Sequence, residues 1–179
     1  MQNRLLKNSV CGFTLIELLI VITCVCLFFS STRHMYHLYR RVVLYAASDY
    51  MAATCSYLAQ SARTHKLRTY LSLITSSSYS IYDGKIKKEY SLPMGVFFGP
   101  YEGVLGPPSR PTEKITSPLV GGVLIDGCIS LEWDESGAPT PATCYIHAGE
   151  ECCAISMSRA IVCQPTQWVL SERLWLTAG

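Results

Sequence analysis

Charged residues are scarce in this chain of 179 residues, and long apolar runs are scarcer still. Charged side chains make up 16% of the chain and leave a formal net charge of +2, which is too small to indicate a polyanion as partner. Only residues 13–30 form a long, predominantly apolar run, so the sequence predicts a single membrane span. At about 1.5 Å per helical residue this run reaches roughly 27 Å, enough to cross the hydrocarbon core of a bilayer.

Glycine and proline are absent between Phe13 and Asp83. A helix that begins in the apolar run can therefore continue beyond it without a breaker. Apolar residues at spacings of three and four predict an amphipathic half over residues 31–66. The stripe expected to face a core consists of Met35, Leu38, Val42, Ala46, Tyr50, Ala53 and Tyr57.

Catalytic motifs are also absent: the sequence has no Gly-x-Ser-x-Gly, no phosphate loop and no His-Glu-x-x-His. Cys144 and His147 are conceivable as a nucleophile and its base, but proximity in sequence does not make a dyad. The acids of the predicted turns lack the regular spacing of a calcium loop, so they are interpreted as solvated. These acids are Asp126, Asp134, Glu135, Glu150 and Glu151. We therefore expect no enzyme, no cofactor and no metal site.

Nine cysteines are present, but none forms a Cys-x-x-Cys pair, which disfavours a zinc site. One or two disulfides are plausible if the part beyond the apolar run faces an oxidising compartment, and the sequence cannot choose the pairing. The candidates are Cys55, Cys128, Cys144, Cys152, Cys153 and Cys163.

The apolar run begins with the motif Gly12-Phe13-Thr14-Leu15-Ile16-Glu17, after a short polar leader that carries Arg4 and Lys7 and no acid. A carboxylate at the centre of a bilayer costs about 2.5–3.5 kcal/mol on insertion scales, so Glu17 is expected to be functional. The motif resembles the processing site of type IV prepilins and type II secretion pseudopilins. The resemblance implies that a prepilin peptidase cuts between Gly12 and Phe13 and methylates Phe13. It also implies that Glu17 serves assembly by pairing with an amine of another subunit.

Residues beyond 66 have the pattern of short strands separated by turns. The expected strands are 67–74, 79–82, 86–92, 119–125, 128–133, 143–148, 153–158 and 168–176, with a hairpin turn at Asp83-Gly84. Together with the resemblance, this predicts an α+β fold in which a long N-terminal helix packs on a small antiparallel sheet. The expected parts are a leader (1–12), a transmembrane half (13–30), an amphipathic half (31–66) and a β-rich head (67–179) with a Pro/Gly-rich loop (99–118).

The order of elements is similar to minor pseudopilins of the GspH/FimT class, and Ala62-Arg63 and Leu92-Pro93…Gly95-Val96 carry this likeness. It implies a structural subunit of a secretion pseudopilus or a type IV pilus. The subunit would be anchored once in the inner membrane, with its N-terminus in the cytoplasm and its head outside it. Expected partners are the peptidase, other pilin subunits, the assembly platform and lipid.

Two alternatives stay open at this level. Minor pilins of DNA-uptake systems use basic patches, and Arg63, Lys66 and Arg68 could contact DNA in that way. An unrelated signal-anchored extracytoplasmic protein is the remaining interpretation.

Overall fold

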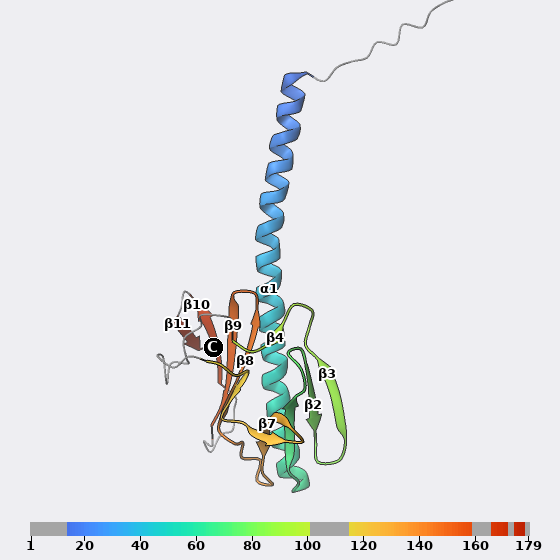
Figure 1. The fold of residues 1–179 in the computed structure, drawn as a ribbon, viewed down its shortest axis with the longest axis vertical. Helices are drawn as coiled ribbons and strands as arrows, with labels where there is room; N and C mark the ends of the chain where they lie inside the picture. The colour runs from blue at the N-terminus through green and yellow to red at the C-terminus, as the bar shows by residue number, and fades with distance from the viewer. Residues whose placement is uncertain (1–13, 101–114, 159–165, 172–173, 178–179) are drawn as a thin grey trace, which may run out of the picture. The chain divides into compact units, whose positions relative to one another are not determined.

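The structure is a computed structural model that describes residues 14–100, 115–158, 166–171 and 174–177. One helix, α1 (Leu15–His65), precedes all of the strands (Figure 1). The strands are β1 (Thr69–Leu73), β2 (Ser78–Tyr82), β3 (Lys87–Ser91), β4 (Phe97–Phe98), β5 (Leu119–Val120), β6 (Val123–Ile125), β7 (Cys128–Trp133), β8 (Ala142–Ala148), β9 (Glu151–Met157), β10 (Thr166–Ser171) and β11 (Leu174–Thr177).

The helix is continuous over 51 residues, as the lack of glycine and proline predicts. It belongs to two compact units, residues 1–38 and residues 39–179, because the boundary between them lies within α1. The helix ends where Lys66 takes a φ of 55°, the left-handed conformation that commonly follows the last helical residue.

In the first unit, every described side chain of α1 is exposed, including the large apolar ones. This is the stretch that makes α1 long and apolar enough to cross a membrane, by length and composition. The first unit offers these side chains no apolar partner of its own, so their cover has to come from outside it.

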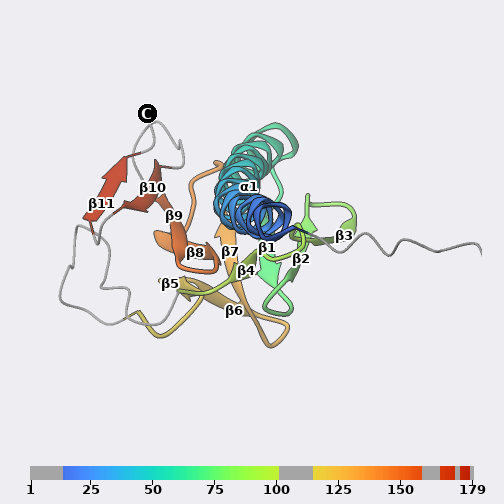
Figure 2. The same ribbon diagram turned by 90° about the horizontal axis from the view of Figure 1, so that it is seen from above.

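The second unit contains two antiparallel sheets. One sheet has the strand order β3-β2-β1-β7-β6, and the other has the order β11-β10-β9-β8-β4, with β5 also paired to β8. The part of α1 in this unit packs on strands of both sheets, and Figure 2 shows the helix beside them. The α+β prediction, a long N-terminal helix packed on antiparallel β-structure, is confirmed.

One hydrophobic core joins α1 to both sheets. The helix contributes large side chains such as Leu44, Met51 and Leu58, and small ones such as Ala47 and Ala62. A smaller cluster lies on the other face of the six-stranded sheet, because alternate residues of a strand point to opposite sides. Its members are Ile115, Tyr145, Cys152 and Ala154, with Trp168 packed against them.

The predicted core stripe of α1 is wrong. Met35, Val42, Tyr50 and Tyr57 are all at least half exposed, whereas Ser48, which is not part of the expected stripe, is buried. The buried face runs through Leu44, Ala47, Ser48, Met51, Thr54, Cys55, Leu58, Ala59, Ser61 and Ala62. From Tyr50 to Met51 this is a shift of one residue, or roughly 100° around the helix. Small side chains occupy much of the buried face because they let the helix approach the sheets closely.

The hairpin prediction is confirmed, with a longer connection than expected. Tyr82 pairs with Lys87, so the loop between β2 and β3 has four residues, Asp83 to Ile86, rather than two. The carboxylate of Asp83 accepts the backbone N–H groups of Lys85 and Ile86 at 3.0 and 2.9 Å, which closes the wider loop.

Two long strands predicted from the sequence are each two strands in the structure. The first, 119–125, divides into β5 and β6, which belong to different sheets. Gly121 and Gly122 lie at the division, and a Cβ on Gly122 would be 2.5 Å from Leu119 Cδ2 and 2.9 Å from the Ser130 carbonyl oxygen. The second, 168–176, is the antiparallel pair β10 and β11. Apolar residues on both sides of a short reversal appear in sequence as one run.

Candidate functional site

The start of α1 is held by a reciprocal set of hydrogen bonds between Thr14 and Glu17. The carboxylate oxygen Oε2 of Glu17 accepts the backbone N–H and the hydroxyl of Thr14, both at 2.8 Å. In return, the hydroxyl oxygen of Thr14 accepts the N–H of Glu17 at 3.3 Å. This is a capping box, in which the residue before the helix and the third helical residue satisfy each other's N–H groups.

The capping box fixes where the Glu17 carboxylate lies. The carboxylate sits at the helix N-terminus, where the helix dipole favours negative charge. Among the described residues, both of its hydrogen bonds go to Oε2, and Oε1 accepts none. At the start of α1, the arrangement thus leaves one carboxylate oxygen bound and, as far as the described residues go, one open.

Thr14 was not predicted as a site residue from the sequence, where Glu17 stood out only as an acid in an apolar run with a partner expected on another chain. The spacing Thr-x-x-Glu before an apolar run is itself a capping-box signature and could have identified the pair. Gly12 and Phe13, the two residues of the predicted cleavage site, lie outside the described residues, so processing stays a prediction.

The cysteine candidates are free thiols wherever the structure describes them. Cys55, Cys144, Cys152 and Cys153 are buried, Cys128 is partly exposed, and Cys163 lies outside the described residues. Burial raises the pKa of the Cys55 thiol to about 12 and, with smaller contributions from neighbouring groups, that of Cys153 to about 12 as well. Since the thiolate is the reactive form, these thiols are poor nucleophiles in the folded protein.

The pairing of Cys144 with His147 does not occur. Both lie on β8, and three residues along a strand place two side chains on opposite faces. Cys144 belongs to the core under α1, and burial raises its pKa. The His147 ring is on the other face, where Nδ1 lies 2.9 Å from the carbonyl oxygen of Gly99.

The basic residues considered for DNA are partly engaged within the chain. Arg63 Nε donates to the carbonyl oxygen of Ser136 at 3.1 Å, and Arg68 lies 3.4 Å from a carboxylate oxygen of Glu132. Lys66 is exposed at the helix end. Arg63 thus contacts the turn after β7, and Arg68 contacts β7 itself.

The acidic turn residues also have local roles. The Asp134 carboxylate accepts the N–H groups of Ser136 and Ala138, and Glu151 pairs with Arg41 at 2.6 Å. Within the described parts of the chain, no group of three or more His, Cys, Asp or Glu residues is arranged to hold a metal ion. Most of the Pro/Gly-rich loop 99–118 lies outside those parts.

Comparison with known proteins bears on the start of α1. No curated protein and no solved structure matches the chain significantly. A family model described as the prokaryotic N-terminal methylation motif matches residues 7–31, which include Gly12, Phe13, Thr14 and Glu17. The chain therefore carries a prokaryotic N-terminal methylation motif at the start of the long apolar helix that the structure describes, which is a type IV pilin-like feature.

Proposed function

We propose that the chain is a structural minor pilin or pseudopilin, a non-enzymatic subunit of a type II secretion pseudopilus or a type IV pilus. The observation that carries this is the methylation motif at 7–31 on a helix of 51 residues whose second part packs on a β-rich unit. The motif supports processing by a prepilin peptidase. The proposed cut is between Gly12 and Phe13, followed by N-methylation of Phe13.

The proposed topology has one span, with the leader in the cytoplasm and the β-rich head outside it. Residues 13–30 would cross the inner membrane, residues 31–66 would continue the helix, and residues 67–179 would form the head. The exposed apolar face of Leu15 to Leu38 supports this, because only lipid or other subunits could cover it. In the assembled filament, the same face would contact neighbouring helices.

The proposed assembly step is electrostatic. Glu17 approaches the N-terminal amine of an adjacent subunit, and each neutralises the other's charge in a dry environment. The capping box supports the step, because it leaves Oε1 open while Thr14 holds Oε2 near the new N-terminus. Pairing of this kind would set the axial register between subunits.

Within the family, the order of elements supports the GspH/FimT class of minor pseudopilins. A helix that ends after Ala62-Arg63, then β1, then the hairpin β2–β3 and the Leu92–Val96 connection is the arrangement expected of that class. The DNA-uptake alternative depends on Arg63, Lys66 and Arg68. Because Arg63 and Arg68 are engaged within the chain, a filament role is favoured.

The proposal is tested by the intact mass of the protein from membranes of hosts with and without the prepilin peptidase. We expect the loss of Met1 to Gly12 and the gain of one methyl group only where the peptidase is present. Gly12→Asp should abolish both changes. A full-length, unmethylated chain in both hosts would reduce the motif to a signal anchor.

The role of Glu17 is tested separately with Glu17→Ala. This variant should be cut normally, because the cleavage residues are intact, but should be lost from sheared filaments. Normal incorporation of the variant would contradict the register role and leave the processing site untouched.

A further inference from the structure

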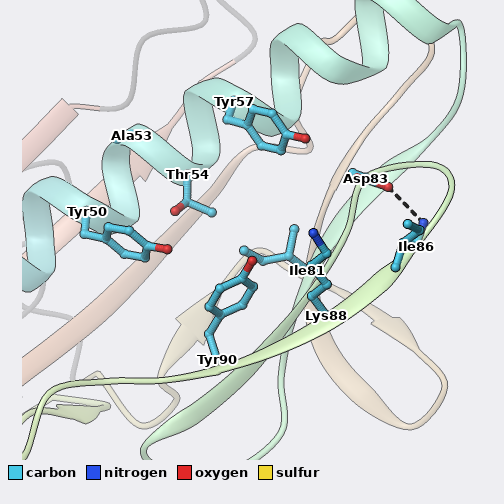
Figure 3. A pocket seen from close by; sticks show the side chains of 9 residues that line it. All are labelled: Tyr50, Ala53, Thr54, Tyr57, Ile81, Asp83, Ile86, Lys88 and Tyr90. Carbon is cyan, nitrogen blue, oxygen red and sulfur yellow. Dashed lines mark hydrogen bonds between the residues drawn. The ribbon is translucent and has the colours of Figure 1, made fainter.

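A groove in the second unit lies between α1 and the β2–β3 hairpin. Its volume is about 270 Å³. The helix contributes Tyr50, Ala53, Thr54 and Tyr57, and the hairpin contributes Ile81, Lys88 and Tyr90 among others. Figure 3 shows the rings of Tyr50 and Tyr57 on one side and Lys88 with Tyr90 on the other. The groove is smaller than a typical pocket for a drug-sized ligand and suits one or two side chains.

The groove is lined by one positive and one negative side chain, Lys88 and Asp83. In the described part of the chain, the ammonium group of Lys88 has no hydrogen bond and no carboxylate within 4.0 Å, but the backbone N–H of Ile86 and, to a smaller extent, the charge of Lys88 lower the pKa of Asp83. The nearby carboxylate of Asp83 is directed to the backbone N–H groups of its own loop, as Figure 3 shows for Ile86. Lys88, with the phenol groups of Tyr57 and Tyr90, therefore offers donors to an anionic group.

The hairpin also offers a free strand edge beside the groove. β3 is the end strand of its sheet and pairs only with β2 among the described strands. Lys88 lies opposite Ile81 and Tyr90 lies opposite Tyr79, so both side chains are on the face that looks toward α1. A strand added to β3 would place every second side chain on that same face, next to Lys88 and Tyr90.

Lysines on an edge strand usually prevent pairing with another strand, because they cannot be buried against an apolar partner. An acidic partner removes that obstacle. We propose that β3 and this groove form a docking site for an extended acidic segment of a partner polypeptide. The segment adds to the edge of β3 and places one carboxylate on Lys88. This second interface does not depend on the filament role proposed for the helix.

The charge of Lys88 has a matched control in the next residue. Lys87 lies on the same strand, is exposed and has the same charge, but it is opposite Tyr82 and outside the groove lining. Lys88→Glu and Lys87→Glu change the net charge equally. Because Lys87 lies outside the groove, only Lys88→Glu reverses a charge inside it. Similarly, Tyr57→Phe removes a groove hydroxyl, whereas Tyr70→Phe changes a ring that stacks on Tyr82 outside it.

The test is photo-cross-linking of the full chain in its native membranes, with a benzophenone amino acid in place of Ile86, an exposed residue of the groove lining. We expect an adduct with a polypeptide whose cross-linked segment contains Asp or Glu. Lys88→Glu should reduce the adduct about tenfold, and Lys87→Glu should change it less than about twofold. Changing the partner's acid to Lys should restore the adduct with Lys88→Glu and with no other variant.

An adduct that both lysine variants reduce equally, an adduct with lipid or nucleic acid, or the absence of any polypeptide adduct would each overturn the proposal. The intact mass of the same sample separates this outcome from the proposed function. A processed, methylated chain without the adduct rejects only the docking site. An adduct on an unprocessed chain rejects only the filament role.

Discussion

The two parts of α1 have the same backbone and opposite surroundings. From Leu15 to Leu38 every side chain is exposed, although most of them are apolar, whereas from Leu44 to Ala62 one face is buried against the sheets. The first part of α1 carries many large apolar side chains around the helix, whereas the second part buries many small side chains along one stripe. In this helix, apolar content therefore indicates where an external partner is needed, and small residues indicate where the chain packs on itself.

The largest expected effect compares two leucines, one from each part. Leu58 has 0% of its surface exposed and Leu19 has 57%. Leu58→Ala should lower the free energy of unfolding by about 2–5 kcal/mol, because it leaves a cavity in the core. Leu19→Ala should change it by less than about 0.5 kcal/mol. Denaturant unfolding of the detergent-solubilised chain, followed by the fluorescence of buried Trp133, measures both.

Equal losses of unfolding free energy from Leu58→Ala and Leu19→Ala would contradict this difference between the two parts of α1. They would mean that the first part of the helix is also packed within the chain. If Leu58→Ala lowered the free energy of unfolding only slightly, the core under α1 would be able to collapse around the missing atoms.

The second prediction concerns the register of the buried face. Ala46 and Ala47 are adjacent, but Ala46 belongs to the stripe expected from the sequence and is exposed, while Ala47 is buried. Ala47→Leu should cost about 1–3 kcal/mol, because it overpacks the contact with the sheets. Ala46→Leu, with the same change in helix propensity, should be nearly neutral. A reversal of these results in the same unfolding assay would restore the predicted stripe.

The third prediction uses pH. The pKa of Cys55 in the fold is about 12, against an ordinary value of 9.0, because burial disfavours the thiolate. The neutral thiol stabilises the fold fully below pH 9, and this contribution is lost as pH rises from about 9 to about 12. By about pH 10.5 the loss should reach about 1–2 kcal/mol.

The measurement is the slope of unfolding free energy against pH, since other groups also titrate in this range. Cys55→Ala should flatten the slope above pH 9 relative to the unmodified chain, whatever its own cavity costs. Parallel slopes for the two proteins would show that the Cys55 thiol is accessible to water.

The smallest expected effect is at the surface of the second part. Arg41 and Glu151 form an ion pair at 2.6 Å, and their side chains are 55% and 22% exposed. The hydrogen bond and the charge of Glu151 raise the pKa of Arg41. Arg41→Gln should lower the free energy of unfolding by about 1 kcal/mol at most, because solvent screens exposed pairs. High salt should reduce the difference between the two proteins, and a salt-independent loss would contradict a screened pair.

Local signals in the sequence predicted much of the fold. The length of α1 followed from the absence of glycine and proline after Phe13, and the hairpin followed from Asp83-Gly84 between two β-prone runs. Short reversals of the chain were harder to predict, because the apolar residues on both sides of Gly121-Gly122 have the pattern of one strand. The candidate site was predicted at Glu17 but not at Thr14, because the acid was considered for its charge and not for the N–H groups that it caps.

The amino-acid sequence alone is enough to predict one long apolar helix, a methylation motif at its start and short antiparallel strands after it. These features depend on neighbours along the chain: breakers, caps, turns and alternation. The packing of distant elements fixes which face of α1 is buried and that Lys88 faces a groove. These depend on the distance between elements that are remote in sequence, and closely packed contacts favour small side chains, which hydrophobic periodicity overlooks.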